Sequence, residues 1–144
     1  MAKTDDLALL VGRCGIAALF IPDGFDKLAH FARFADSLAR RGLPFPDIWA
    51  AVGIVSDLGG AIAVLIGFEV RWASLMMIAF VAMASALSHR YWEVADTAAR
   101  RAQEGQFYKN LALIGGFLFL HVVGAGAYSV DAWRRRRMAR RPAA

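Results

Sequence analysis

Three ionisable side chains lie inside apolar stretches of the sequence, where they could carry out acid–base chemistry. Asp57 lies at the centre of residues 48–68, and Arg13 and His121 lie within two other apolar stretches. A carboxylate at the centre of a bilayer costs about 3 kcal/mol, so Asp57 should face protein or water rather than lipid. We expect Arg13 to be its partner, because pairing would offset the burial cost of both groups. Alternatively, Arg13 extends to the nearer headgroups.

The chemistry that these three residues could support is proton transfer to a buried ligand. Counting helix rise from the segment ends places Asp57 and His121 each about 15 Å from either membrane surface, so we expect them at one depth. Histidine donates or accepts a proton near neutral pH, and a carboxylate can relay it. Arg13, Asp57 and His121 are therefore candidates for a site that hydrogen-bonds a quinone carbonyl. The structural alternative is an ion pair and a satisfied histidine that fix helix register.

A second polar cluster is expected near the helix ends on the far side of the membrane from the termini. This cluster could bind a polar headgroup or an anion such as a sulfur oxyanion, or it could cap helix ends and anchor the interface. Its members are Asp23, Asp26, Lys27, His89, Lys109 and Asn110.

The sequence offers few groups that could carry electrons. The single Cys14 excludes an internal disulfide and a Cys-Xaa-Xaa-Cys pair, and no spacing suggests zinc or covalent haem. His89 and His121 are expected about 15 Å apart in depth, which disfavours a shared haem. We therefore expect neither metal nor intrinsic cofactor. A quinone or a partner subunit would have to supply the carrier.

Composition indicates a membrane protein. Of 144 residues, 58% are hydrophobic, compared with about 45–50% in ordinary soluble domains. A soluble bundle would have to bury four blocks of nearly spanning length in one small domain, which disfavours that class. Lys3 precedes two acids, and no small-residue cleavage motif follows, so we do not expect a cleavable signal. The four predicted spans are residues 7–25, 48–68, 72–87 and 110–130.

The connections complete an all-α architecture. Residues 26–47 carry apolar side chains at helical spacing and predict an amphipathic helix that lies in the interface or packs over the mouth of the bundle. The link at residues 69–71 is short enough to force an antiparallel hairpin, and residues 94–109 should form a solvated helix or loop. The predicted fold is a membrane-spanning antiparallel four-helix bundle with an interfacial amphipathic helix between helices 1 and 2. Residues 1–133 form one domain, and residues 134–144 a basic tail.

The charge distribution predicts topology. The net charge is +5, and six of the seventeen lysines and arginines lie in the last eleven residues. A basic segment beside a membrane helix marks the cytoplasmic side, so four crossings would place both termini in the cytoplasm. We expect the lipid bilayer, rather than nucleic acid, to be the partner of this tail.

An ordered set of motifs between Leu10 and Asp131 resembles the DoxX family of small bacterial four-helix membrane proteins. The motifs are Gly12-Arg13, residues 24–28 (Gly-Phe-Asp-Lys-Leu), residues 42–44 (Gly-Leu-Pro), residues 57–60 (Asp-Leu-Gly-Gly) with Gly67, residues 89–92 (His-Arg-Tyr-Trp), residues 107–116, and residues 124–131. Two positions depart from the family pattern. Asp57 replaces the more usual Glu, and His121 replaces a plain apolar residue.

The resemblance implies a bacterial inner membrane location and an association with redox chemistry. Family members are similar to the membrane subunit of a thiosulfate:quinone oxidoreductase, or to membrane partners in thiol and oxidative-stress complexes. The resulting hypothesis is an integral membrane subunit of a quinone-linked redox system, with a soluble or membrane oxidoreductase subunit as a candidate partner. The alternative is a non-catalytic accessory or assembly protein in which an Arg13–Asp57 pair is structural. A small-solute transporter is a third hypothesis, and whether the chain is an enzyme stays open.

Overall fold

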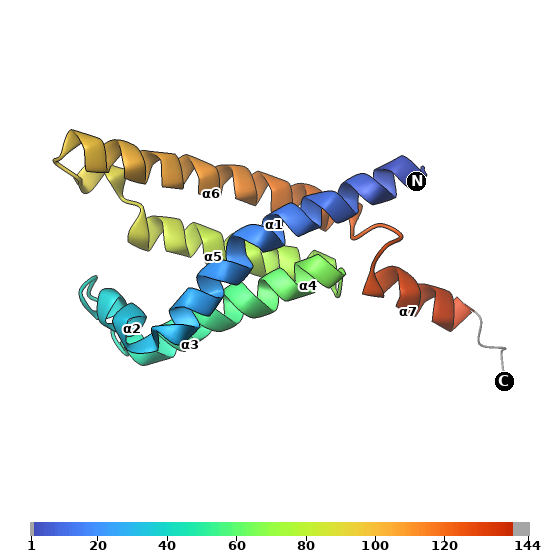
Figure 1. Cartoon of the computed structure of the whole chain (residues 1–144), viewed down its shortest axis with the longest axis horizontal. Helices are drawn as coiled ribbons and strands as arrows, with labels where there is room; N and C mark the ends of the chain where they lie inside the picture. The colour runs from blue at the N-terminus through green and yellow to red at the C-terminus, as the bar shows by residue number, and fades with distance from the viewer. Residues whose placement is uncertain (1, 140–144) are drawn as a thin grey trace.

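A computed structural model describes residues 2–139, and every regular element in that range is helical (Figure 1). Four helical stretches are long and apolar enough to cross a membrane: Lys3–Ala29, Pro46–Ile66, Val70–Glu93 and Thr97–Val123. The predicted all-α, four-span class is confirmed. The elements are α1 (Lys3–Ala29), α2 (Phe31–Ala39), α3 (Pro46–Val55), the π-helical turn η1 (Ser56–Gly60), α4 (Ala61–Ile66), α5 (Val70–Ser88), the 3₁₀ turn η2 (Tyr91–Glu93), α6 (Thr97–Val123) and α7 (Val130–Ala139).

The four spans alternate in direction. Figure 1 shows the start of α1 and helix α7 at one end of the molecule, which we call the terminal end, and α2 at the other, which we call the α2 end. Helices α3, η1 and α4 form one continuous span, and a short turn at Gly67 joins it to α5 as an antiparallel hairpin. Gly67 has φ +67°, a conformation that suits glycine at a helix C-terminus.

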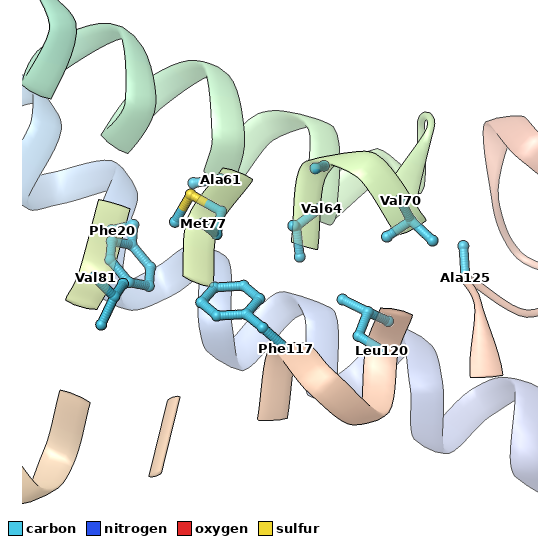
Figure 2. Close-up of a cluster of buried hydrophobic side chains, with 10 residues drawn as sticks. Phe20, Ala61, Val64, Val70, Met77, Val81, Phe117, Leu120 and Ala125 are labelled. Atoms are coloured by element: carbon cyan, nitrogen blue, oxygen red, sulfur yellow. The ribbon is translucent and has the colours of Figure 1, made fainter. Parts of the chain in front are cut away.

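The core lies where the four spans meet. Phe20 of α1, Val64 of α4, Met77 of α5 and Phe117 of α6 are buried against one another (Figure 2). The Phe20 and Phe117 ring centroids are 6.1 Å apart. Large apolar side chains also cover the outside, where Phe119 is 76% exposed. Such a surface suits lipid, and helix association in lipid depends on close packing of this kind.

The predicted amphipathic helix is confirmed as α2. Its Ala35 and Leu38 are buried against Ala50 of α3, separately from the main core. A turn with Gly42 at φ +80° follows, and Pro46 begins α3.

Helix α6 differs from the sequence expectation at both ends. The Asp96 carboxylate accepts a hydrogen bond from the Ala99 backbone N–H, so the helix begins at Thr97 and includes most of the connection expected at residues 94–109. It ends at Val123, because Gly124 and Gly126 both have positive φ angles. The predicted span to residue 130 was therefore too long. The proposed boundary between domain and tail at residue 133 falls inside α7, and Arg140 and Arg141 lie outside the described residues.

A buried lysine–aspartate pair beside a cavity

The position of Asp57 depends on a close crossing of α1 over η1. A Cβ atom at Gly24 would lie 2.8 Å from the Leu58 side chain and 3.1 Å from the Asp57 Cβ atom, so any larger residue would have to displace the Leu58 side chain. Asp57 is 1% exposed as a result. Its location in a π-helical turn is notable, because such turns occur frequently at functional sites.

Asp57 pairs with Lys27, and the predicted Arg13–Asp57 pair is wrong. The Lys27 Nζ atom lies 2.5 Å from Asp57 Oδ2 and 2.5 Å from Asp23 Oδ2. Arg13 precedes Gly24 by eleven residues, or about 16 Å along the helix, so it cannot reach the level where α1 crosses η1. Lys27 can, because helical side chains point back toward the N-terminus of their helix.

The pair is only partly satisfied within the described chain. Asp57 Oδ1 is buried and has no hydrogen-bond partner there. The Lys27 ammonium also lies 5.3 Å from the Phe34 ring centroid and 6.0 Å from that of Phe80, both within cation–π range. With both carboxylates ionised, this group carries one excess negative charge. Asp57 Oδ1 therefore keeps an unused acceptor position.

A cavity of about 460 Å³ adjoins the pair at the α2 end of the bundle. Its walls come from α1, α2, α3, η1, α5 and α6. Most of the lining surface is apolar and comes from side chains that include Phe20, Trp49 and Phe80. Its polar lining is Asp23, Lys27, Ser37, Arg41, Asp57, Ser88, His89, Gln106, Lys109 and Asn110.

Five of the six residues predicted for the outer cluster line this one cavity: Asp23, Lys27, His89, Lys109 and Asn110. The sixth, Asp26, points elsewhere and contacts His30 and Arg33. Asp57, which we had assigned to a separate inner site, lies on the wall of the same cavity. Asp57 of the predicted inner site and five residues of the predicted outer cluster therefore line the same cavity.

The cavity wall formed by α5 and α6 is held by its own hydrogen bonds. Asn110 Nδ2 donates to Ser85 Oγ at 2.9 Å, and Ser85 Oγ donates to the Val81 carbonyl. His89 Nδ1 lies 2.8 Å from Gln103 Oε1. These contacts orient Asn110 and His89 in the cavity lining, so a ligand would meet polar groups from α6 and the end of α5 as well as from α1 and η1.

Arg13 has a structural position near the terminal end. Its Nη1 atom donates to the carbonyls of Val64 (3.4 Å) and Leu65 (2.8 Å), and its Nη2 atom donates to the Tyr128 carbonyl (2.5 Å). The first two carbonyls belong to the last turn of α4, where helices leave acceptors unsatisfied. Arg13 therefore closes the end of α4 and fastens the loop after α6 to it.

His121 does not share the depth of Asp57. It lies three positions before Gly124, and its Nδ1 atom is 3.0 Å from the Arg71 carbonyl at the start of α5. The predicted constellation of Arg13, Asp57 and His121 is not brought together. The predicted depth of His121 is wrong because the predicted span extends to residue 130, beyond the glycines that end α6.

Two aspartates at the terminal end were not singled out from the sequence as site residues. Asp131 accepts hydrogen bonds from the backbone N–H groups of Glu69 and Val70, which caps the start of α5. Asp6 accepts one from the Ala127 backbone N–H. Both contacts join residues more than sixty positions apart, so no local spacing could have shown them.

Comparisons with known proteins agree with this architecture. A family model named DoxX matches residues 8–90, which include Asp23, Lys27, Asp57 and His89. The chain is 32% identical to inner membrane protein YqjF of Escherichia coli (strain K12), over 91% of this chain and 95% of that protein. It is 30% identical to inner membrane protein YphA of the same organism, over 85% and 87% of the two chains. A further relative is ER-derived vesicles protein ERV29 of Saccharomyces cerevisiae, at 33% identity over 60% of this chain and 27% of that protein. No solved structure matches.

Proposed function

The chain belongs to the DoxX family of integral membrane proteins, and we propose that it is the membrane subunit of a quinone-linked redox system, with the quinone bound beside Lys27 and Asp57. The inner membrane location named for the two E. coli relatives supports the same location here. The arginines of α7 favour a cytoplasmic terminal end. On this topology the cavity opens toward the opposite, periplasmic side.

The observation that carries the proposal is a buried carboxylate with an unused oxygen, beside a lysine, on the wall of a largely apolar cavity. A quinone is an apolar ring with two carbonyl acceptors, and its reduced form carries hydroxyl donors. Lys27 can donate to a carbonyl of the oxidised form. Asp57 Oδ1 can accept from a hydroxyl of the reduced form. Apolar walls with a few placed polar groups are the usual features of small-molecule sites.

The pair also suits the proton balance of the reaction. Reduction of a quinone to its hydroquinone consumes two electrons and two protons. In the proposal, a partner oxidoreductase subunit supplies the electrons, and Lys27 and Asp57 deliver or accept protons at the ring oxygens. The Asp23 carboxylate also pairs with Lys27, so the Lys27 ammonium keeps one ionised partner when Asp57 is protonated.

The alternative is an accessory protein in which the buried pair only locks the helices together. Arg13 and Asp131 already perform that task at the terminal end through bonds to backbone groups. The unused Asp57 oxygen and the adjoining cavity favour ligand binding over a purely structural pair.

Trp49 provides a direct test, because it lines the cavity and quinones quench tryptophan fluorescence. Protein in lipid nanodiscs would be titrated with a short-chain benzoquinone. We expect saturable quenching that depends on Trp49. Asp57→Asn should weaken quinone affinity about tenfold or more, because a hydrogen bond to a charged group contributes about 1.5–3 kcal/mol.

Asp26→Asn is the matched control, since this acid directly precedes Lys27 in α1 but lies outside the cavity, with its side chain 60% exposed. Circular dichroism and thermal unfolding would establish that each variant is folded. A folded Asp57→Asn or Lys27→Met variant that binds the benzoquinone as tightly as the unaltered protein would refute the proposal.

A further inference from the structure

A second cavity, of about 840 Å³, lies at the terminal end, where α5 begins, α6 ends and α7 begins. It is separate from the quinone cavity and plays no part in the proposal above. Its lining combines basic side chains from α5 and α7 with apolar side chains that belong at a membrane boundary. The basic members are Arg71, Arg134, Arg135 and Arg136, and the apolar members include Trp72, Val123 and Met138.

The acids that line this cavity are already engaged. Asp6 and Asp131 accept hydrogen bonds from backbone N–H groups. Glu69 pairs with Arg134 at 2.8 Å. Among the described residues, Arg135 and Arg136 have no carboxylate partner, and Arg71 donates only to the Val122 carbonyl, at 3.4 Å. Three guanidinium groups from two helices are therefore available to an anion.

The start of α7 is held against the bundle. The Asp131 carboxylate holds the first backbone N–H groups of α5, and the Asp131 backbone N–H donates to the Gly67 carbonyl at 3.0 Å. Arg134 adds its bond to Glu69. These contacts place the start of α7 beside the first turn of α5, so the arginines of both helices line one cavity.

The cavity lies at the level where acyl chains meet headgroups. All four spans begin or end at this side, and Trp72, in the first turn of α5, is 70% exposed. Exposed tryptophan at a span end is typical of the membrane interface. Val123 and Met138 add to the apolar lining, so an occupant would meet both guanidinium groups and apolar side chains.

We propose that this cavity binds the phosphate headgroup of an anionic phospholipid, with Arg71, Arg135 and Arg136 as its ligands. A guanidinium presents paired donors that match phosphate oxygens. Basic pockets between transmembrane helices on the cytoplasmic side are known to take such headgroups. The apolar lining at Trp72 and Met138 contacts the glycerol and upper acyl region.

The test measures lipid binding to the purified full chain in mild detergent by native mass spectrometry. The probes are phosphatidylglycerol and cardiolipin, with phosphatidylcholine as the zwitterionic comparison and inorganic phosphate as a competitor. We expect both anionic lipids to bind more tightly than phosphatidylcholine, and inorganic phosphate not to displace them. Arg135→Gln with Arg136→Gln should weaken anionic lipid binding about 30-fold, because each arginine near an anionic surface accounts for about fivefold.

The matched control removes the same charge elsewhere. Arg100→Gln with Arg101→Gln alters two exposed arginines among the first five residues of α6, at the α2 end. This variant should bind lipid as the unaltered protein does. Arg71→Gln should weaken binding in the same direction as the α7 variant, since the site needs both helices.

Three results would overturn the proposal: equal losses in the cavity and control variants, equal affinity for phosphatidylcholine, or displacement by inorganic phosphate, which would indicate a site for the free anion. If the double variant fails to fold, the single Arg136→Gln change on the exposed surface of α7 replaces it. That change should weaken binding about fivefold, and a folded single variant with unchanged affinity would count against the site.

Discussion

Removal of the Lys27 ammonium should destabilise the bundle more than removal of either acid that it contacts. Lys27→Met leaves Asp57 buried without a cation, and it leaves Asp23 without its partner as well. Loss of one member of a buried pair costs about 3–5 kcal/mol. The Lys27 side chain is 22% exposed and lies beside a cavity that can admit water, so we expect a loss of about 3 kcal/mol. Asp57→Asn leaves Lys27 bound to Asp23 and should cost about 1 kcal/mol.

A double-mutant cycle separates this pair from the rest of the site. Unfolding free energies would be measured by denaturant titration in mild detergent. The Lys27→Met change should be partly rescued when Asp57 is replaced by Leu, because the unpaired buried charge is then absent. The cycle should give a coupling energy of about 2 kcal/mol. The same cycle between Arg13→Leu and Asp57→Leu should give none, since Arg13 lies about three turns along α1 from the Gly24 crossing that places Asp57.

The control for Lys27→Met is Arg33→Met, which breaks the exposed pair with Asp26 and should cost less than about 1 kcal/mol. The reasoning is refuted if Lys27→Met costs no more than this control, or if Asp57 couples to Arg13 instead.

Three further predictions concern packing and the terminal end. Gly24→Ala should lower the free energy of unfolding by about 1–3 kcal/mol, because the new Cβ atom would press on the Leu58 side chain. A Cβ atom at Gly12 would meet nothing within 4 Å, so Gly12→Ala should be tolerated. Thermal unfolding of the two variants compares them directly. Arg13→Leu should cost about 2–4 kcal/mol in denaturant unfolding, since the carbonyls at the end of α4 lose their donor, and a loss below 1 kcal/mol would contradict that role. His121→Leu should leave benzoquinone affinity unchanged, because this side chain lies away from the cavity; a clear loss of quenching would show that our placement of the site is incomplete.

The architecture could be predicted from the sequence because each element carries its own signal. Four apolar runs of spanning length and one amphipathic run settle the number and kind of helices, and Asp57 stood out as a charge that had to be buried. Five residues of the outer cluster were predicted together because alternating spans bring the matching ends of the predicted apolar segments to one side of the bundle. Proximity of that kind follows from topology alone.

The partner of Asp57 could not be obtained in the same way. It depends on the register between α1 and the span from α3 to α4, and that register is set by contacts such as Gly24 against Leu58. The depth of His121 depends on where α6 stops, which the positive φ angles of Gly124 and Gly126 determine. Both errors came from placing residues by their position within a segment, rather than by the contacts that align one segment with another.

The π-helical turn at Ser56–Gly60 changes the direction in which the side chains of its span point before and after the turn. One additional residue in a helical turn rotates everything beyond it by about 100°. The half before the turn directs Ala50 toward α2, and the half after it directs Ala61 and Val64 into the main core. A single helix thus serves two separate hydrophobic clusters, and the buried aspartate lies at the joint between them. Deletion of one glycine from this turn would therefore leave the composition and length of the span almost unchanged, yet misdirect one of its halves.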